Sequence, residues 1–282
     1  MPRTSVQQER LLQWLQASLI ADHKHQLESK EKELLYRVVT PGTHVRLLEN
    51  ISRWARTKYT SSGGPSVYWL FGPAGTGKST IAYTIARRFE FTGKHDDPII
   101  LGANFFCSRQ FEETRESKRI IRTIVYHLAL ACEPFADALT RFWKFEAFDF
   151  DVQTQIENLL VKPWQESESA RNKASTQLYL VVIDALDEIV GQDGGKQDGS
   201  EFLRDLFDAI NRSQLRGLKF FVTSTPDPEL VTHVKSFKKK LQKFYLLQDV
   251  AELDDQADTE ELGPIWNDWK WVQRLRMSAN RK

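Results

Sequence analysis

Two stretches near the start of the chain carry apolar residues at helical spacing. In residues 5–37 the apolar positions recur three or four apart, which predicts an amphipathic helix that needs a partner (Leu11, Leu12, Leu15, Leu19 and Ile20). A second such pattern follows the break at 40–43 and includes Val45, Leu48, Ile51 and Trp54. A Ser/Gly/Pro loop at 60–65 closes it. We therefore expect a helical N-terminal segment over 1–37 and a helical lead-in with its loop over 38–65.

From residue 66 the pattern changes to short apolar runs that alternate with helical stretches, which is typical of β-α units around a mostly parallel sheet. The expected strands are 67–71, 99–106, 178–183, 218–223 and 244–247. The expected helices are 78–90, 118–132, 135–145, 201–212 and 228–235. The polar segments 162–176 and 191–200 are expected to be surface loops. We assign 66–250 to an α/β core and 251–282, an acidic run followed by a Trp-rich basic stretch, to a loosely ordered tail.

Composition narrows the class of protein. The 282 residues contain 39 Lys and Arg against 38 Asp and Glu, so the formal net charge of +1 gives no reason to expect a nucleic-acid partner. Two cysteines, Cys107 and Cys132, are too few for a disulfide framework. No signal peptide or transmembrane segment is evident in the pattern. We expect a soluble, cytoplasmic protein.

One motif carries specific chemistry. Residues 72–80 match the pattern G-x-x-x-x-G-K-[ST] between an expected strand and an expected helix. Glycines let backbone N–H groups converge on phosphates, and the helix N-terminus adds positive potential. Lys78 is expected to reach the β and γ phosphates of a nucleotide, and Ser79 to hold Mg²⁺. The predicted nucleotide-binding residues of this loop are Gly72, Pro73, Ala74, Gly75, Thr76, Gly77, Lys78, Ser79 and Thr80.

A second element supplies the acid that such a loop needs. The apolar run 178–183 ends in Asp184, which is predicted to share Mg²⁺ with Ser79. Asp187 and Glu188 follow and are the candidates to polarise a hydrolytic water. The 106 positions between Lys78 and Asp184 leave room for an additional strand at 99–106, which favours the additional-strand division of P-loop NTPases. No N-K-x-D element follows Asp184, so guanine specificity is unsupported.

Further candidate site residues lie at the end of, or shortly after, two other expected strands. Thr223 ends the run 218–223 and Ser224 follows it, and both are predicted to reach the γ-phosphate or the attacking water. Arg109 follows the expected strand 99–106 and is a further candidate for phosphate binding.

Together these elements resemble the NACHT domain of STAND-class P-loop NTPases, in particular the nephrocystin-type N-terminal NACHT of fungal NLR-like proteins. The resemblance spans about 38–250 and rests on the loop 72–80, the run L-V-V-I-D-A-L-D-E at 180–188, P-G-T at 41–43 and N-F-F-C-S-R at 104–109. It implies a three-layer α/β P-loop fold that binds ATP or ADP with Mg²⁺. It also implies slow hydrolysis coupled to self-association, or to association with homologous NACHT proteins. Thr225 and His44 depart from the family pattern, since each stands where the family commonly has Arg.

Two other functions stay open at this point. The resemblance implies a helical lid and a winged-helix domain beyond the core, and the 282 residues end before either could form. The chain is therefore either an ATPase switch or a truncated, non-hydrolysing module that binds nucleotide and regulates its partners. A P-loop kinase is a third possibility, which the spacing of Lys78 and Asp184 does not suit.

Overall fold

The protein is described by a computed structural model. It covers residues 5–24, 38–40, 43–57, 66–90, 98–142, 150–174, 177–189, 197–213, 215–226, 228, 232 and 245–249. The predicted helix 228–235 and the predicted tail 251–282 therefore lie outside the described residues, apart from positions 228 and 232.

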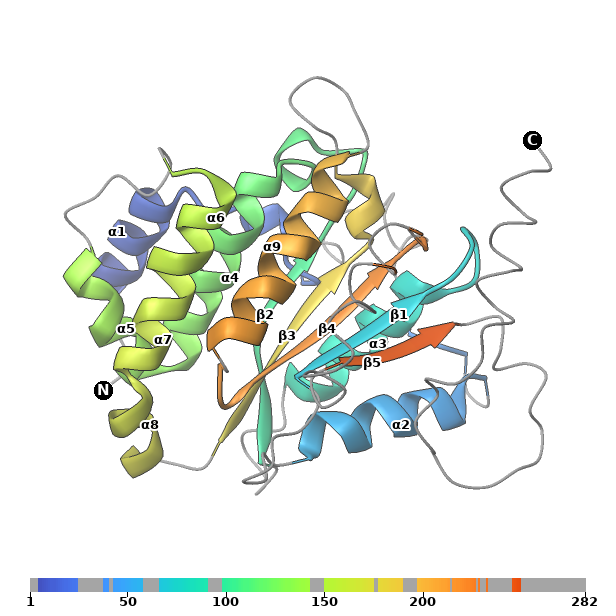
Figure 1. Ribbon diagram of the computed structural model, residues 1–282, viewed down its shortest axis with the longest axis horizontal. Helices are drawn as coiled ribbons and strands as arrows, with labels where there is room; N and C mark the ends of the chain where they lie inside the picture. The colour runs from blue at the N-terminus through green and yellow to red at the C-terminus, as the bar shows by residue number, and fades with distance from the viewer. Residues whose placement is uncertain are drawn as a thin grey trace.

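A five-stranded parallel sheet forms the centre of the molecule (Figure 1). Its strands are β1 (Val67–Phe71), β2 (Ile99–Phe106), β3 (Leu178–Asp184), β4 (Leu218–Ser224) and β5 (Tyr245–Asp249), in the spatial order β2-β3-β4-β1-β5. All five expected strands are present, with end points that shift by at most two residues. Because the strands are parallel, their carboxyl ends lie along one edge, where Phe71 is paired with Ser224 and Phe106 with Asp184.

The strand order confirms the additional-strand division but corrects one detail of it. The strand inserted between the P-loop strand β1 and the acidic strand β3 is β4, which pairs with both. The run 99–106, which the spacing suggested for this place, forms β2 at the sheet edge next to β3. Sequence spacing shows that an extra strand exists, but not which neighbour it pairs with.

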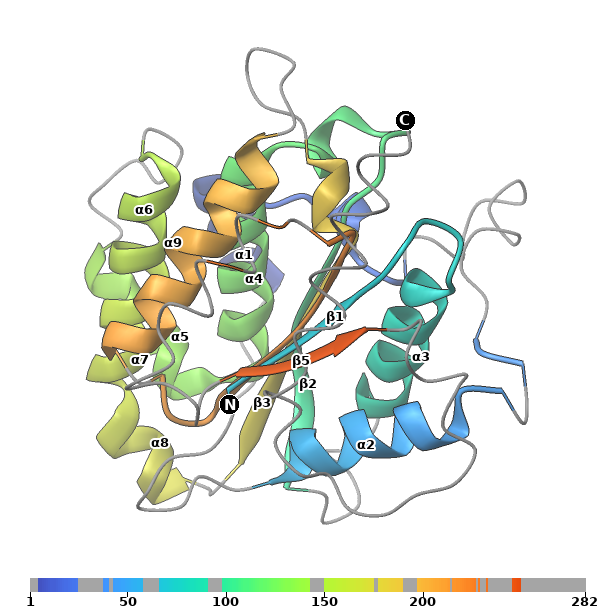
Figure 2. The same cartoon turned by 45° about the vertical axis from the view of Figure 1, so that its right-hand side comes forward.

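Helices cover both faces of the sheet and make three layers (Figure 2). On one face lie α2 (Val45–Arg56) and α3 (Lys78–Glu90). The other face carries α1 (Ser5–Leu15), α4 (Ser117–Ala131), α5 (Glu133–Leu139), α6 (Val152–Gln155), α7 (Lys162–Glu166), α8 (Glu168–Ala174) and α9 (Gln197–Ser213). Along β1, Val67, Trp69 and Phe71 enter one core cluster and Tyr68 and Leu70 the other, as the two-residue period of a doubly buried strand requires.

The segment 162–176 corrects a second expectation, because it is not a surface loop. A continuous helical stretch runs from α6 through a π-helical segment (Ile156–Val161) into α7, and α8 follows. Trp164 is only 1% exposed and packs edge to face on Tyr179. The guanidinium of Arg171 lies 3.7 Å from the Trp164 ring centroid and donates to the Trp164 carbonyl, so a buried aromatic residue holds this polar-looking sequence in the core.

The prediction of a loop over 191–200 is wrong for residues 197–200, which form the first turn of a helix. Helix α9 begins at Gln197, four residues before the expected start at 201. A Cβ atom on Gly199 would collide with the carbonyl oxygen of Leu186, so the missing side chain lets the first turn of α9 lie directly on that residue. The glycine that indicated a loop is instead required for close packing.

The N-terminal segment packs on the core rather than apart from it. Leu11 and Leu15 of α1 are buried in the same cluster as α4, which supplies the partner that the amphipathic pattern required. Beyond α1, the backbone N–H of Ser18 donates to the Thr123 hydroxyl, and that of His23 donates to Oδ1 of Asn104 in β2. Residues 18–23 therefore lie against β2 and α4.

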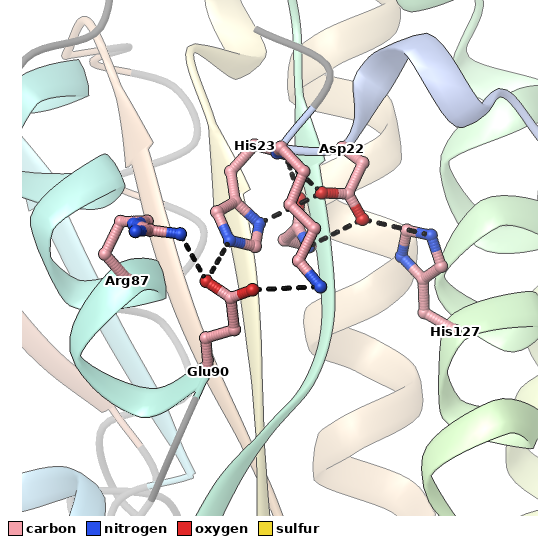
Figure 3. A network of polar contacts seen from close by, with 7 residues as sticks. Asp22, His23, Arg87, Glu90 and His127 are labelled. Carbon is pink, nitrogen blue, oxygen red and sulfur yellow. Dashed lines mark hydrogen bonds and ion pairs between the residues drawn. The ribbon is translucent and has the colours of Figure 1, made fainter. Parts of the chain in front are cut away.

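A polar network fixes this segment to the end of α3 (Figure 3). His23 is 1% exposed, and its two ring nitrogens lie 3.1 Å from Asp22 Oδ1 and 3.1 Å from Glu90 Oε2. Nε2 of His127 in α4 lies 3.5 Å from the other Asp22 oxygen, and Arg87 pairs with Glu90 at 2.8 Å. Burial alone would raise the pKa of Asp22, but the hydrogen bond with His23 and the charge of His127 outweigh it and lower that pKa far below its usual value.

None of the described helices is both long enough and apolar enough to cross a membrane.

Candidate nucleotide-binding site

The predicted site residues meet at the carboxyl edge of the sheet. The loop 72–80, called the P-loop below, joins the end of β1 to the start of α3, and Asp184 ends β3 two strands away. Between them lies β4, which ends in Thr223 and Ser224. Ligand sites of open parallel sheets lie at this edge, because loops there diverge to opposite faces of the sheet.

The conformation of the P-loop depends on two glycines. Gly75 and Gly77 both have φ of +82°, a left-handed backbone that residues with a side chain adopt only with strain. The hydroxyl of Thr76 donates to the Pro73 carbonyl at 2.9 Å, and the Ile81 amide donates to the Gly77 carbonyl at 3.0 Å to begin α3. The sequence therefore forms a compact loop that leads directly into a helix N-terminus, which is the geometry of an anion site.

Lys78 folds back over this loop. Its Nζ atom donates to the carbonyls of Gly72 and Pro73, each at 2.8 Å, and the residue is 8% exposed. The ammonium group is therefore held directly above the loop, within reach of any phosphate that the loop amides bind.

Asp184 lies at the bottom of the site and is fully buried. Its Oδ1 accepts a hydrogen bond from the Thr223 hydroxyl at 2.5 Å, and that hydroxyl accepts one from the Ala185 amide at 2.9 Å. Burial raises the pKa of Asp184 to about 6, the hydrogen bonds from Thr223 and Ser79 oppose that rise, and the nearby Glu188 and Asp187 add to it. Oδ2 of Asp184 is buried and has no hydrogen-bond partner in the described part of the chain.

These observations fit a magnesium ion. Ser79 and Asp184, which the sequence places 105 positions apart, interact across the site, and the unpartnered Asp184 oxygen offers a hard anionic ligand. Among the described residues no group of three or more His, Cys, Asp or Glu side chains could hold a metal alone. Mg²⁺ in nucleotide sites keeps several waters and binds phosphate oxygens, so two protein ligands are sufficient.

Asp187 and Glu188 occupy a 3-10 turn (η8, Leu186–Glu188) directly after β3. Asp187 Oδ1 accepts a hydrogen bond from the Thr225 amide at 2.9 Å, and Glu188 Oε2 accepts one from the Arg109 amide at 2.9 Å. The two acids thus connect the end of β3 to the ends of β4 and β2. A left-handed residue, Ala185 with φ of 55°, turns the chain so that they can do so.

Ser224 and Arg109 lie at the same edge with different surroundings. The Ser224 hydroxyl accepts a hydrogen bond from the Trp69 indole at 2.9 Å and donates to the Thr225 carbonyl at 2.9 Å. Arg109 is exposed, and it is its backbone amide that joins the site through Glu188. The structure therefore places Ser224 in a structural hydrogen-bond chain and gives Thr223 the contact with Asp184.

One site residue was not predicted from the sequence. Nε2 of His44 lies 3.8 Å from the position that a Cβ atom on Gly77 would occupy, so the lead-in helix α2 reaches the P-loop. The sequence marked His44 only as a departure from a family pattern. A signal for its position existed in the P-G-T-H break before α2, since such a break allows the sharp turn that His44 makes.

The fold and the arrangement of Lys78, Ser79 and Asp184 define the class of P-loop NTPases, in the division with an additional strand. The family model described as Nephrocystin 3, N-terminal matches residues 42–225, and the chain belongs to this family. The match confirms the expected resemblance and covers the P-loop, β3 and the end of β4. A comparison with curated proteins finds no match.

Two similar solved structures share little sequence identity with this chain. The ORC2 protein of Aeropyrum pernix, in complexes with ADPNP and ADP, is 14% identical over 77% of this chain and 50% of its own, with a TM-score of 0.43. A DnaB-like replicative helicase is 15% identical over 88% of this chain and 61% of its own, with a TM-score of 0.25. This chain thus spans about half the length of the ORC2 protein. Both scores are low, so the assignment rests on the family match and the strand order.

Proposed function

We propose that this protein is an ATP-binding molecular switch of the NACHT type, which binds MgATP and MgADP at the P-loop and hydrolyses ATP slowly. The observation that carries the proposal is the meeting of the Lys78 ammonium, the glycine-dependent loop and the buried Asp184 at one sheet edge. Loop amides and Lys78 would bind the phosphates, and Ser79 with Asp184 would hold Mg²⁺. The bound ion would neutralise phosphate charge.

The chain's own residues support a defined role for each acid. Asp184 is oriented by Thr223, so its free oxygen is held in one position. Asp187 and Glu188 are the candidates for polarising water, and both already accept backbone hydrogen bonds from neighbouring strand ends. A carboxylate has further acceptor capacity, so either acid can accept a water proton while it keeps its backbone contact.

The same contacts suggest how the switch would work. Asp187 accepts a hydrogen bond from the Thr225 amide, directly after β4, and Glu188 accepts one from the Arg109 amide, in the segment that follows β2. A change at the nucleotide phosphates would move these loops together, which would alter the surface that a second copy or a homologous NACHT protein binds. The two cysteines of the chain are buried free thiols, which supports the cytoplasmic location that we propose for it.

The second candidate is a module that binds nucleotide without hydrolysing it. It is favoured by Thr225, which stands where the family commonly has Arg and which offers its amide, not a cation, to the site. A missing cation near the γ-phosphate would slow turnover strongly, since such an arginine contributes about 10³-fold or more in related chemistry.

Turnover by purified protein distinguishes the two functions. We expect phosphate release from MgATP that Lys78→Ala abolishes and that Lys173→Ala, an exposed lysine on α8, leaves unchanged. Size-exclusion chromatography with light scattering, in ADP and in a non-hydrolysable ATP analogue, tests the coupling to self-association. Binding without turnover would leave only the regulatory module, and phosphate release that Lys78→Ala leaves intact would contradict both functions.

A further inference from the structure

We infer that His44, at the N-terminus of α2, is a further phosphate-binding residue of the nucleotide site. Its imidazole donates a hydrogen bond to a phosphate oxygen of the bound nucleotide. The inference rests on the proposed function and deepens it by adding a residue from outside the P-loop, β3 and β4. It concerns phosphate recognition, and not the base.

The first observation is the position of the imidazole. Nε2 of His44 lies 3.8 Å from the Cβ position of Gly77, the residue directly before Lys78. His44 is partly buried, and its ring therefore lies against the loop rather than in bulk solvent. An imidazole N–H beside a loop of backbone N–H donors adds one donor to the group that would surround a phosphate.

The second observation is a left-handed backbone that brings the ring there. His44 has φ of 51° and ψ of 24°, which is uncommon for a residue with a side chain, although His tolerates it better than most. The turn is supported on both sides: the Thr43 hydroxyl donates to the Thr40 carbonyl at 2.8 Å, and the Leu48 amide donates to the His44 carbonyl at 2.9 Å. Strained backbone of this kind is found where a side chain must be aimed.

The third observation concerns the helix that His44 begins. His44 is the N-cap of α2, its side chain makes no capping hydrogen bond, and the first turn contains no acidic residue. The Arg56 guanidinium at the other end of α2 lies 5.0 Å from the ring centroid of Phe89, near the end of α3. The two helices therefore run in the same direction, and their positive N-terminal ends converge on the P-loop.

Packing fixes this arrangement. The Arg88 guanidinium of α3 donates to the Ser52 hydroxyl at 2.7 Å, and Trp54 and Tyr68 pack edge to face at 5.4 Å between α2 and β1. Helix α2 is thus held to both α3 and the sheet, so the backbone of His44 stays beside the loop unless the helix moves. An imidazole held in advance binds without a large ordering cost.

The test uses the full chain and three probes: MgATP, MgADP and magnesium tripolyphosphate. His44→Asn and His44→Gly both keep a residue suited to the left-handed backbone but remove the donor from reach of the loop. His44→Arg keeps a donor at this place. We expect both donor-removing variants to raise the Kd for all three probes about tenfold, and His44→Arg to retain wild-type affinity. Arg53→Ala, exposed on the same helix, should leave every Kd unchanged.

The outcomes separate this inference from the proposed function. If the wild type binds MgATP in a Lys78-dependent manner but His44→Asn and His44→Gly bind as tightly, the inference is wrong and the proposed function stands. A loss confined to ATP and ADP, with tripolyphosphate unaffected, would show a contact with the nucleoside and would also overturn it. If the wild type binds none of the probes, both the function and the inference fail. Thermal unfolding without ligand verifies that each variant folds.

Discussion

The Thr223 hydroxyl donates a 2.5 Å hydrogen bond to Asp184, so the residue that ends β4 orients the acid that ends β3. We predict that Thr223→Val, which keeps the shape of the side chain but removes the hydroxyl, weakens MgATP binding by roughly tenfold, because a charge-assisted hydrogen bond is lost next to a buried carboxylate. Nucleotide binding in the presence of EDTA should change little, because the lost contact serves the metal ligand. Titration calorimetry with and without Mg²⁺ measures both.

Thr223→Ser is the matched control, since it retains the hydroxyl and should retain Mg²⁺-dependent affinity. Equal losses with and without Mg²⁺ in Thr223→Val would show that Thr223 supports the loop in general and not Asp184 in particular.

Alanine substitutions at two glycines should destabilise the protein for different physical reasons. A Cβ on Gly102 in β2 would lie 2.9 Å from both Leu128 Cδ2 and Tyr179 Cβ, so Gly102→Ala should lower the unfolding free energy by about 1 to 3 kcal/mol through overpacking. Gly75 has φ of +82° and open space around its Cβ position, so Gly75→Ala introduces only backbone strain, about 1 to 2 kcal/mol, within the P-loop.

We therefore expect denaturant unfolding to detect both variants, and nucleotide titration to detect only Gly75→Ala, because Gly75 lies in the P-loop. A Gly75→Ala variant with wild-type affinity would mean that the left-handed loop conformation is not needed for binding.

The network around Asp22 predicts how the free energy of unfolding changes with pH in the acidic range. The pKa of Asp22 is lowered in the folded state, so its stabilising contribution is complete above the ordinary aspartate value, about 4. The contribution declines progressively as pH falls below that value towards the much lower pKa of the folded state. Asp22→Asn should cost about 1 to 3 kcal/mol at pH 7, because His23 and His127 lose their partner. The difference between wild type and variant should shrink from pH 5 to pH 3 in urea unfolding.

A difference that stays constant over that range would contradict the assignment of the low pKa to Asp22. Glu49→Gln, which changes an exposed acid on α2, serves as the control.

Lys219 predicts a second increase of stability with pH, this time at alkaline pH. This lysine is fully buried in β4 beside Trp54, and burial lowers its pKa to about 8. Since the unfolded chain holds the proton up to about pH 10.4, the folded state gains stability as pH rises above 8. Compared with Lys219→Met, the wild type should gain about 2 kcal/mol between pH 7 and pH 9.5.

Measuring the difference from Lys219→Met removes the contributions of buried groups such as Cys107, whose raised pKa acts in the other direction. Parallel stability curves for the two proteins would show that Lys219 keeps its proton across this range.

Much of the core could be predicted from the sequence because its signals are local. The apolar runs of β1 to β4 are short and flanked by polar or glycine residues, and the loop 72–80 has a fixed pattern. Asp184 could be identified because an acid that ends a buried strand contrasts with its neighbours. These features depend on a few consecutive residues, which a single sequence shows directly.

What could not be predicted depends on contacts between distant residues. Trp164 brings a polar-looking segment into the core by packing with Tyr179 and Arg171, and Gly199 lets a helix begin where a loop was expected. The contact between His44 and the P-loop arises from the packing of α2 on α3. Tertiary packing overrides local propensity at such places. The P-G-T-H break indicates a turn at His44, but not the contact with the P-loop that this turn makes.

The most direct test of the account is a titration of MgATP into the purified 282-residue chain, in parallel with Lys78→Ala, Asp184→Asn and the control Lys173→Ala. The account predicts saturable binding at one site in the wild type and in Lys173→Ala. It predicts a loss of about 100-fold or more in Lys78→Ala, and a loss in Asp184→Asn that appears only with Mg²⁺. Absence of binding by the wild type, or equal binding by wild type and Lys78→Ala, would contradict it.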